Sequence, residues 1–345
     1  MANLPAPVRP LIIASASFLF LGVVAPASGQ APASITQTEP RLDFPAGLAT
    51  DGRAVYVANS RNNAITAIDL TTRSISILAG ATFQQGSNDG VGPAARFDSP
   101  DGMIIVGRNL YLLDTNNSDL RKIDLDTRIV TTAAGTANIS GTEDGHATAA
   151  HFNLPTQIAT DGNYLYITDS GNSTIRRVSL ADGMVKTIGG QPQQTGKEEG
   201  PPAKSVFNGP RGIATDGKNV YISDTGNDVI RKIDLSTMTS STIAGTGEEG
   251  ADDGPGDKAK FNNPGGMCSD GKTVYILDAD NHAVRKLDPA TNQVSTLTLA
   301  NGHIGSGCTV SSDGRTLYYS DTTENSVQAT DTSNGNYVSL YPPGQ

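Results

Sequence analysis

Val206-Phe207-Asn208-Gly209-Pro210 is the stretch that decides the fold. The part that repeats is a phenylalanine, a polar residue directly after it, and a proline three positions after the phenylalanine. It recurs with phenylalanines at positions 97, 152, 207 and 261, which are 55, 55 and 54 residues apart. A period in this range indicates a repeat architecture, in which each unit buries its apolar faces against the next unit.

One repeat contains four short strands. After the proline, residues 212–215 and 219–224 predict two strands joined by the Asp216-Gly217 turn, because alternating apolar residues flank a turn dipeptide. Residues 229–234 and 239–244 predict two further strands. Each unit is therefore expected to be a four-stranded antiparallel meander.

Turn dipeptides place six such units along the chain. They are Asp51-Gly52, Val106-Gly107, Asp161-Gly162, Asp216-Gly217, Asp270-Gly271 and Asp313-Gly314. A sheet with two apolar faces is not stable alone, whereas six sheets arranged radially cover one another's faces. The predicted fold is all-β, a six-bladed β-propeller of four-stranded antiparallel blades.

An aspartate at the end of the second strand and an arginine in the third strand stand seven residues apart in four units. The pairs are Asp114 with Arg121, Asp169 with Arg176, Asp224 with Arg231, and Asp278 with Arg285. In an antiparallel hairpin such residues are diagonal neighbours on one face, so we expect structural ion pairs. Unit one has Asn59 and Thr66 instead. Unit six keeps Asp321 opposite Gln328, which favours a more solvated position.

These phrases resemble the NHL repeat, whose pattern runs Pro-x-Gly-Ile-Ala, an Asp-Gly turn, Val-Tyr-Val-x-Asp and Asn-x-x-Ile-Arg-x-Ile-Asp. Residues 210–217, 220–224 and 227–234 follow it closely, and the likeness covers residues 42–343. The resemblance implies a six-bladed propeller that binds proteins, nucleic acids or small molecules, or in some branches does chemistry.

The first 29 residues have the order of regions of a secretory signal. Arg9 precedes an apolar run from Leu11 to Val24, and small residues follow at 25–29. Residues 30–41 form a lead-in, in which the β-branched stretch 34–38 is a candidate edge strand. We therefore expect a secreted or periplasmic protein, with no membrane insertion after signal cleavage.

Charge and cysteine content narrow the partners. Without Arg9 the chain carries 24 basic and 35 acidic residues, a net charge of −11. Such an acidic protein lacks the clustered basic residues that nucleic acid requires, so no nucleic-acid partner is expected. We also expect the protein to be a monomer. Cys268 and Cys308 are an even count for an oxidising compartment, which leaves open a disulfide or two buried thiols.

The polar residue after each phenylalanine is a candidate for a binding site at the mouth of the central channel. In unit one the corresponding position follows a leucine. The five residues are Asp43, Asp98, Asn153, Asn208 and Asn262. They would hold a polar ligand or a metal if they converged, as acid and amide groups do in gluconolactonase-like propellers. The alternative is that each side chain caps its own turn before the proline.

Acidic pairs in the glycine-rich loops between units are weak candidates for Ca²⁺ ligands. The loop with most acids contains Asp252, Asp253 and Asp257. Calcium takes six to eight oxygen ligands, but these loops lack the alternating acids of a calcium loop, and Asp-Gly is also common turn chemistry. No cofactor is predicted, with Ca²⁺ as the open alternative.

The leading hypothesis for function is an extracytoplasmic binding or scaffold module that holds a protein or a small molecule on one face of the propeller. This is the face made by the loops before the inner strands and after the second strands. It rests on a rigid scaffold without a complete catalytic set. The alternative is a metal-dependent lactonase-like or lyase-like enzyme with its site at the central channel. The four histidines occupy different repeat positions, which gives no pair with ligand spacing.

Overall fold

The structure is a computed structural model that describes residues 40–299 and 304–341. The chain from Glu39 onward forms one compact unit. The predicted signal segment, 1–29, and nearly all of the lead-in lie outside the described residues. Within the described part the helical segments are 3₁₀ turns of three residues, and none is long and apolar enough to cross a membrane.

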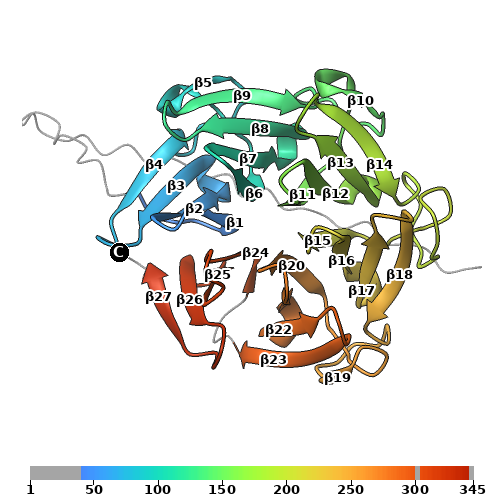
Figure 1. Cartoon of the computed structure of the whole chain (residues 1–345). Helices are drawn as coiled ribbons and strands as arrows, with labels where there is room; N and C mark the ends of the chain where they lie inside the picture. The colour runs from blue at the N-terminus through green and yellow to red at the C-terminus, as the bar shows by residue number, and fades with distance from the viewer. Residues whose placement is uncertain (1–39, 300–303, 342–345) are drawn as a thin grey trace, which may run out of the picture. The chain divides into compact units, whose positions relative to one another are not determined.

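Six antiparallel sheets stand around a common centre, as predicted (Figure 1). Each inner strand packs against the inner strands of the two neighbouring blades. From blade one to blade six the inner strands are β1 (Pro45–Thr50), β6 (Pro100–Val106), β11 (Pro155–Thr160), β15 (Pro210–Thr215), β20 (Pro264–Ser269) and β24 (Ile304–Val310).

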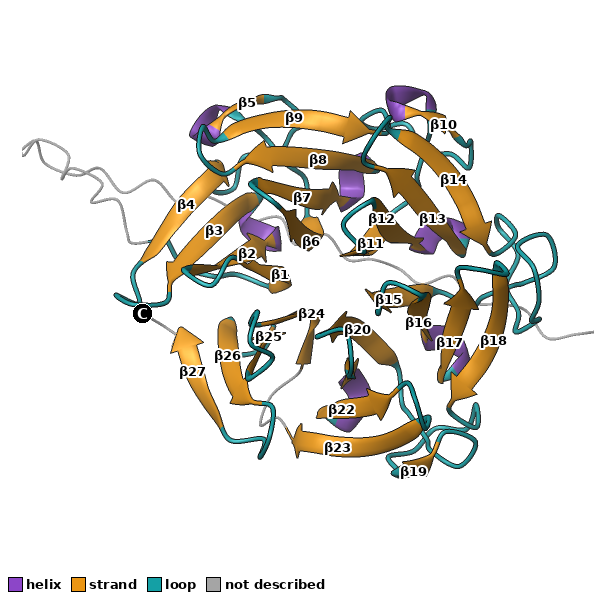
Figure 2. Ribbon diagram, in the orientation of Figure 1, coloured by secondary structure: helices purple, strands orange, loops and turns teal. Residues whose placement is uncertain are grey.

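The remaining strands of each blade follow outward in chain order (Figure 2). The second strands are β2 (Ala54–Asn59), β7 (Asn109–Asp114), β12 (Tyr164–Asp169), β16 (Asn219–Asp224), β21 (Val274–Asp278) and β25 (Thr316–Asp321). The third strands are β3 (Ala64–Asp69), β8 (Asp119–Asp124), β13 (Thr174–Ser179), β17 (Val229–Asp234), β22 (Ala283–Asp288) and β26 (Ser326–Asp331). The outer strands are β4 (Ile75–Gly80), β9 (Ile129–Ala134), β14 (Met184–Gly189), β18 (Thr239–Ala244), β23 (Gln293–Leu299) and β27 (Tyr337–Tyr341).

Short 3₁₀ turns connect the second and third strands of the first five blades and also lie in two of the loops between blades. The turns after the second strands are η1 (Ser60–Asn62), η3 (Thr115–Asn117), η5 (Ser170–Asn172), η6 (Thr225–Asn227) and η7 (Ala279–Asn281). The turns between blades are η2 (Gly92–Ala94) and η4 (Ala147–Ala149).

Three blades have a fifth strand that the sequence did not predict. The two-residue strands β5 (Gly90–Val91), β10 (Gly145–His146) and β19 (Gly254–Pro255) pair with the outer strands of blades two, three and five. Each follows the acidic phrase of the loop between blades, and two residues are too few for an alternating pattern. Gly200 makes a single bridge to Ser240 at the same place in blade four.

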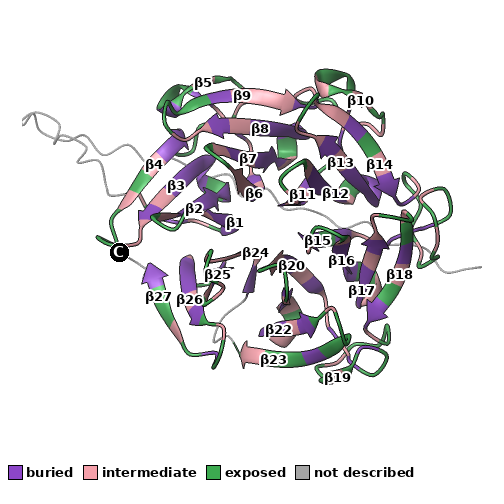
Figure 3. Cartoon of the chain, viewed as in Figure 1, coloured by how far each residue is buried: buried purple, intermediate pink, exposed green. Residues whose placement is uncertain are grey.

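The repeated phenylalanines lie between neighbouring blades. Phe207, which is fully buried, packs with Ile175 and Ile188 of blade three and with Ile222 and Ile233 of blade four. The inner, second and third strands are mostly buried, whereas exposed residues gather on the outer strands and loops (Figure 3). Burial of one such ring stabilises the fold by about 2–3 kcal/mol, so the repeated phrase joins the blades.

All four Asp–Arg pairs of the sequence analysis form ion pairs, and both partners of each pair are fully buried. The distances between the arginine Nη1 and the aspartate Oδ2 are 2.9, 2.8, 3.0 and 2.7 Å in blades two to five. Burial raises the pKa of each aspartate, and the arginine opposes this effect; the pKa of Asp114 is about 6. An unpaired charge here would be costly, so the pair is required as a unit.

Each arginine also ties the loop that precedes its blade. In blade three, Arg176 donates to the backbone carbonyls of His151 at 2.7 Å and Glu143 at 2.9 Å, and it pairs with the Asp144 carboxylate at 3.0 Å. Its guanidinium lies over the ring of Phe152, 5.1 Å from the centroid. One buried cation therefore connects strand, loop and phenylalanine.

Blades one and six lack the arginine of this arrangement. In blade one, Asn59 donates to the Thr66 hydroxyl at 3.3 Å. In blade six, Asp321 is buried rather than solvated, contrary to the expectation for an unpaired acid. Its carboxylate accepts hydrogen bonds from the backbone N–H groups of Thr323 and Glu324, at 3.0 and 2.9 Å.

Packing and one disulfide hold the last blade in the ring. All strands of blade six come from residues 304–341, and apolar residues such as Leu48, Val57 and Leu340 form one cluster where blade six meets blade one. Cys268 and Cys308 form a disulfide with a Cα–Cα distance of 5.7 Å. It joins β20 to β24 and thus crosses the joint between blades five and six.

Replacement of the ion pair of blade three should show strong coupling. Arg176→Thr or Asp169→Asn alone is expected to reduce the free energy of unfolding by about 3–5 kcal/mol, because each leaves a buried group without its partner. The double variant reproduces the Asn59–Thr66 pair of blade one. It should be at least as stable as Arg176→Thr alone in urea denaturation. A double variant that loses the sum of the two single losses would contradict this coupling.

A buried carboxylate in blade two has no hydrogen-bond partner. Asp119 is fully buried and neither of its oxygens finds a partner among the described residues. Burial and the nearby charges of Asp114 and Asp89 raise its pKa from 3.8 to about 7, and Arg121 opposes this shift. The same position holds alanine, threonine, valine or serine in the other blades.

Asp119→Thr should remove a pH-dependent loss of stability. The folded state holds this proton more tightly than the unfolded state, so wild-type stability falls as pH rises from about 4 to about 7. The variant is expected to gain up to a few kcal/mol over wild type across that window. Urea denaturation at pH 4, 5.5, 7 and 8 measures the difference. Thr174→Ala in blade three is the matched control, and an equal gain at every pH would refute the titration.

Candidate functional site

The inner strands approach one another closely because five of the six blades have glycine at the same position. The glycines are Gly47, Gly102, Gly212, Gly266 and Gly307. A Cβ atom at Gly266 would overlap the carbonyl oxygen of Ser306 in the next blade, and one at Gly212 would overlap that of Gly265. The channel is consequently narrow at this level, with little room for side chains.

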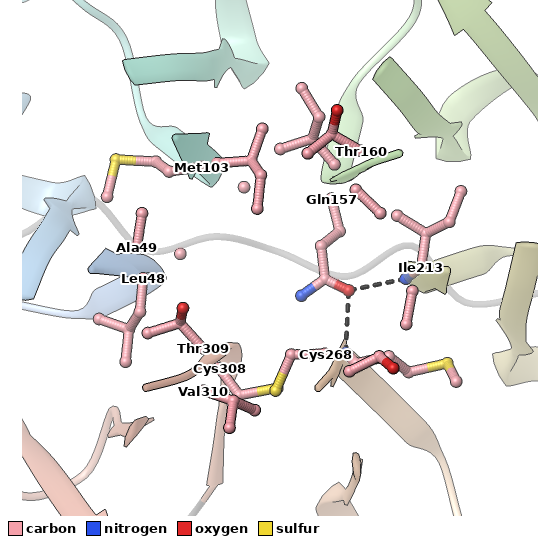
Figure 4. A pocket seen from close by; sticks show the side chains of 18 of the residues that line it. Leu48, Ala49, Met103, Gln157, Thr160, Ile213, Cys268, Cys308, Thr309 and Val310 are labelled. Atoms are coloured by element: carbon pink, nitrogen blue, oxygen red, sulfur yellow. Dashed lines mark hydrogen bonds between the residues drawn. A yellow bond between two sulfur atoms is a disulfide. The ribbon is translucent and has the colours of Figure 1, made fainter. Parts of the chain in front are cut away.

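Gln157 is the residue of blade three at the glycine position, and its side chain crosses the channel. Its Oε1 accepts from the backbone N–H of Ile213 at 2.7 Å and of Met267 at 2.9 Å (Figure 4). Its Nε2 donates to the carbonyl oxygen of Ser306 at 2.9 Å. This one amide therefore bonds to blades four, five and six.

Two cavities share Gln157. The strand-start cavity has a volume of about 350 Å³ and lies where the inner strands begin. It is lined by Phe44, Asp101, Thr156, Gln157, Arg211, Asn263, Gly265, Gly266, Ala279, Ile304, Gly305, Ser306 and Thr322. This is the face of the loops before the inner strands and after the second strands, where the sequence analysis expected the ligand.

The strand-end cavity, of about 210 Å³, follows the inner strands toward their other ends. Leu48, Ala49, Ile158 and Met267 line it together with the threonines at the strand ends, and the Cys268–Cys308 disulfide forms part of its wall (Figure 4). Its terminal threonines are already bonded, for example Thr160, which donates to the Tyr164 carbonyl at 2.8 Å. Polar groups with free capacity are therefore found mainly in the strand-start cavity.

Asp101 is the acidic group of the strand-start cavity. Its Oδ1 accepts from the Ser306 hydroxyl at 2.9 Å. Burial raises its pKa to about 6, although Ser306, the charge of Arg211 and the backbone of Gly47 act in the opposite direction. No basic side chain in the described part of the chain forms an ion pair with it. A carboxylate with this pKa can accept or donate a proton near neutral pH.

Arg211 is the basic group of the same cavity. It lies at the second position of β15, as Asp101 does in β6, so the repeat places their charges at one level of the channel. Its side chain is exposed and forms neither a hydrogen bond nor an ion pair with any described residue. In contrast, Arg121, Arg176, Arg231 and Arg285 each form an ion pair with an aspartate of the same blade.

Residues on both sides of the joint between blades five and six line the cavity. At the other joints in this part of the ring, a hydroxyl at the first position of the 3₁₀ turn donates to the carbonyl of the next blade's proline. The donors are Ser60, Thr115, Ser170 and Thr225, and the acceptors are Pro100, Pro155, Pro210 and Pro264. Blade five has Ala279 at this position, which has no hydroxyl and instead lines the cavity.

The five residues predicted at the channel mouth do not line either cavity. The backbone N–H groups of Asp43, Asp98, Asn153, Asn208 and Asn262 donate to Asn59, Asp114, Asp169, Asp224 and Asp278, respectively. Where side-chain bonds occur, they run to the turn of the same blade, as from Asn208 Nδ2 to the Gly226 carbonyl at 2.9 Å. These contacts match the alternative in which the residues cap turns.

The acids considered for Ca²⁺ have protein partners. The carboxylate of Asp253 pairs with Arg285 at 2.7 Å and accepts from the backbone N–H of Thr296 at 2.9 Å. Asp252 offers its backbone carbonyl to Arg285, and the exposed Asp257 lies 3.7 Å from Lys258. Within residues 40–299 and 304–341, no three His, Cys, Asp or Glu side chains form a metal-binding group.

The sequence does contain a signal for the residues that line the strand-start cavity. It is variation at one position of the repeat, whereas the prediction above relied on the polar residue that recurs after each phenylalanine. In blades one to five the residue after the first proline of the inner strand differs from blade to blade, and it includes Asp101, Thr156 and Arg211. Gln157 is the exception to the glycine at the next position. Departures from the repeat, rather than the repeated polar residue, identify the side chains that face the channel.

Known proteins from animals and a plant are similar to this chain in sequence. No protein-family model matches the chain. NHL repeat-containing protein 2 of Gallus gallus is 28% identical, over 76% of this chain and 41% of that protein. Protein SUPPRESSOR OF QUENCHING 1, chloroplastic, of Arabidopsis thaliana is 29% identical, over 85% of this chain and 31% of that protein. The chain thus spans less than half the length of these relatives.

Solved structures share the fold at low sequence identity. A nidogen/laminin complex has a chain with a TM-score of 0.58 and 18% identity, covering 82% of this chain and 92% of that one. An auxiliary nutrient binding protein from Bacteroides ovatus gives 0.57 and 14%, covering 84% and 69%. A gluconolactonase from Xanthomonas campestris gives 0.56 and 11%, covering 82% and 84%. The homologues of this chain are NHL repeat-containing proteins, and the chain folds as a six-bladed β-propeller of the kind that this repeat implies.

Proposed function

We propose that this chain is an extracytoplasmic binding module that holds a small organic molecule in the strand-start cavity. The observation that carries the proposal is the presence of two opposite charges, Asp101 and Arg211, in one cavity without an ion-pair partner. Ligand sites in proteins are concave, with a few convergent polar groups among apolar walls. Phe44 and Ile304 supply such walls here.

The rigidity of the scaffold supports binding. The floor of the cavity is fixed, because Gln157 bonds to three other blades. A preorganised site loses little conformational entropy when a ligand enters. The auxiliary nutrient binding protein of Bacteroides ovatus gives a precedent for binding on this fold, although its identity of 14% supports the fold alone.

The proposed location outside the cytoplasm has two supports. The sequence of residues 1–29 has the features of a secretory signal. The Cys268–Cys308 disulfide is of the kind that persists in an oxidising compartment. In that compartment the protein would act as a soluble monomer.

A metal-dependent lactonase-like or lyase-like enzyme is the second candidate. The observation that favours chemistry is Asp101, whose pKa of about 6 suits a general acid or base. The fold is also that of a gluconolactonase. A metal would need ligands beyond Asp101, and the nearest cavity groups with oxygen atoms are Thr156, Asn263 and Ser306.

A small-molecule screen with a cavity-filling variant tests the binding proposal. Compounds that raise the melting temperature of the wild type should not raise that of Ala279→Trp, because Ala279 lines the cavity and an indole there would take up part of its space. Ala290→Trp, on an exposed turn of the same blade, is the matched control and should retain binding. Thr322→Trp repeats the test from blade six. Compounds that bind both filled variants as tightly as wild type would contradict the proposed site.

Metal content separates the two candidate functions. We expect purified protein to contain less than stoichiometric divalent metal and its melting temperature to be unchanged by EDTA, since the acids near Asp253 are held by Arg285 and Thr296. Elemental analysis and thermal denaturation with and without EDTA provide the measurement. One tightly bound ion per chain, with a large loss of stability on chelation, would favour the enzyme instead.

A further inference from the structure

We infer that the ligand of the strand-start cavity is a small zwitterion, with its cationic group on Asp101 and its acidic group on Arg211. This inference rests on the proposed function and adds the chemical class of the ligand. Free α-amino acids and short peptides are the simplest molecules of this class. The argument depends on where the two charges lie, on what surrounds them and on the size of the cavity.

The two charges stand on different walls of one cavity. Asp101 belongs to β6 of blade two and Arg211 to β15 of blade four, with β11 of blade three between them. They attract each other electrostatically but form no direct ion pair. A ligand that reaches both walls can therefore pair with each charge separately, which a singly charged molecule cannot do.

The groups between the charges are neutral and already bonded. The amide of Gln157 uses its oxygen for Ile213 and Met267 and donates to Ser306. Thr156 lies within hydrogen-bond distance of Ser170 at 2.6 Å and of the Arg211 carbonyl at 3.1 Å. The groups in the cavity that still lack an oppositely charged partner are thus Asp101, which is acidic, and Arg211, which is basic.

The remaining walls accept a compact organic body. Gly265, Gly266, Gly305 and Ala279 leave space on the side of blades five and six, and Phe44 and Ile304 add apolar surface. The volume of about 350 Å³ is at the small end of ligand sites in proteins. The cavity therefore suits a molecule the size of an amino acid or dipeptide rather than a polymer.

Charge pairing with a ligand also explains why neither group forms an ion pair with another described residue. Burial disfavours the ionised form of Asp101, and an ammonium group beside it would restore that form. A guanidinium binds a carboxylate through two parallel hydrogen bonds, so Arg211 is suited to the acidic end of the ligand. Specificity follows because a blocked ligand would leave one of the two charges in the cavity without an opposite charge.

Charge-blocked probes test the inference directly. Isothermal titration calorimetry would compare free L-amino acids with their N-acetyl derivatives, which keep only the negative charge, and their amides, which keep only the positive charge. We expect each blocked form of the best free amino acid to bind at least about 10-fold more weakly, since one charge-assisted contact is lost.

Two variants connect each ligand charge to its side chain. In Asp101→Asn, the N-acetyl derivative should bind as well as the free amino acid, because the amino group no longer has a partner. In Arg211→Gln, the amino acid amide should bind as well as the free amino acid, because the ligand carboxylate no longer has a partner. Arg315→Gln, which removes an exposed arginine that does not line the cavity, should keep the wild-type preference. Unchanged preferences in both cavity variants would overturn the inference.

The same titrations distinguish this inference from the proposed function. A panel of neutral sugars and singly charged acids and amines is measured beside the amino acids, with Ala279→Trp as the filled cavity. If a compound from that panel binds more tightly than every zwitterion and Ala279→Trp abolishes its binding, the binding function stands and the zwitterion inference is wrong. If no compound of either panel binds in an Ala279-dependent manner, the proposed function itself fails.

Discussion

The buried arginine of the third strand is the constraint on which the blades depend. In blades two to five its guanidinium pairs with the second-strand aspartate and donates to the carbonyls of the preceding loop, for example from Arg231 to Glu198 at 3.0 Å. In three of these blades a loop aspartate adds a second ion pair. Because a buried charge is tolerated only when fully paired, strand and loop have to adopt one geometry together. Each of these blades is therefore held by contacts of its own arginine, and these contacts do not depend on which residues the neighbouring blades contain.

That independence explains how much of the fold the sequence could predict. The patterns that predicted the fold all reflect contacts within one blade, and they are repeated along the chain. They are the alternation of apolar residues, the Asp-Gly turns and the seven-residue spacing seen in Asp224 and Arg231. The short strands β5, β10 and β19 could not be predicted, since two residues show no periodicity and their pairing depends on the outer strand of the same blade. The buried state of Asp321 was also hidden, because its partners are backbone N–H groups of its own turn.

The candidate site was harder to predict for a physical reason. A repeated residue such as Asn208 has the same surroundings in every blade, and its backbone N–H and side chain serve the turn that every blade needs. A ligand site at the axis of a ring is shared by all the blades, so different side chains at equivalent positions can each make a different contact. Asp101, Thr156 and Arg211 occupy one repeat position and differ in charge. The useful signal was variation within the repeat, and only the register of the inner strands shows which variable position faces the channel.

The joint between blades five and six combines the features that make such a site compatible with a stable ring. Ala279 lacks the hydroxyl that, in blades one to four, bonds to the next blade, and its side chain lines the cavity instead. The Cys268–Cys308 disulfide crosses the same joint one layer deeper, where it restricts separation of β20 from β24. The amide of Gln157 adds hydrogen bonds to Met267 on one side of the joint and to Ser306 on the other. The disulfide and the Gln157 amide can replace the stabilisation that the turn hydroxyl gives at the other joints. Neither of them occupies the place of that hydroxyl, so the ring can stay closed at this joint and still keep a cavity beside it.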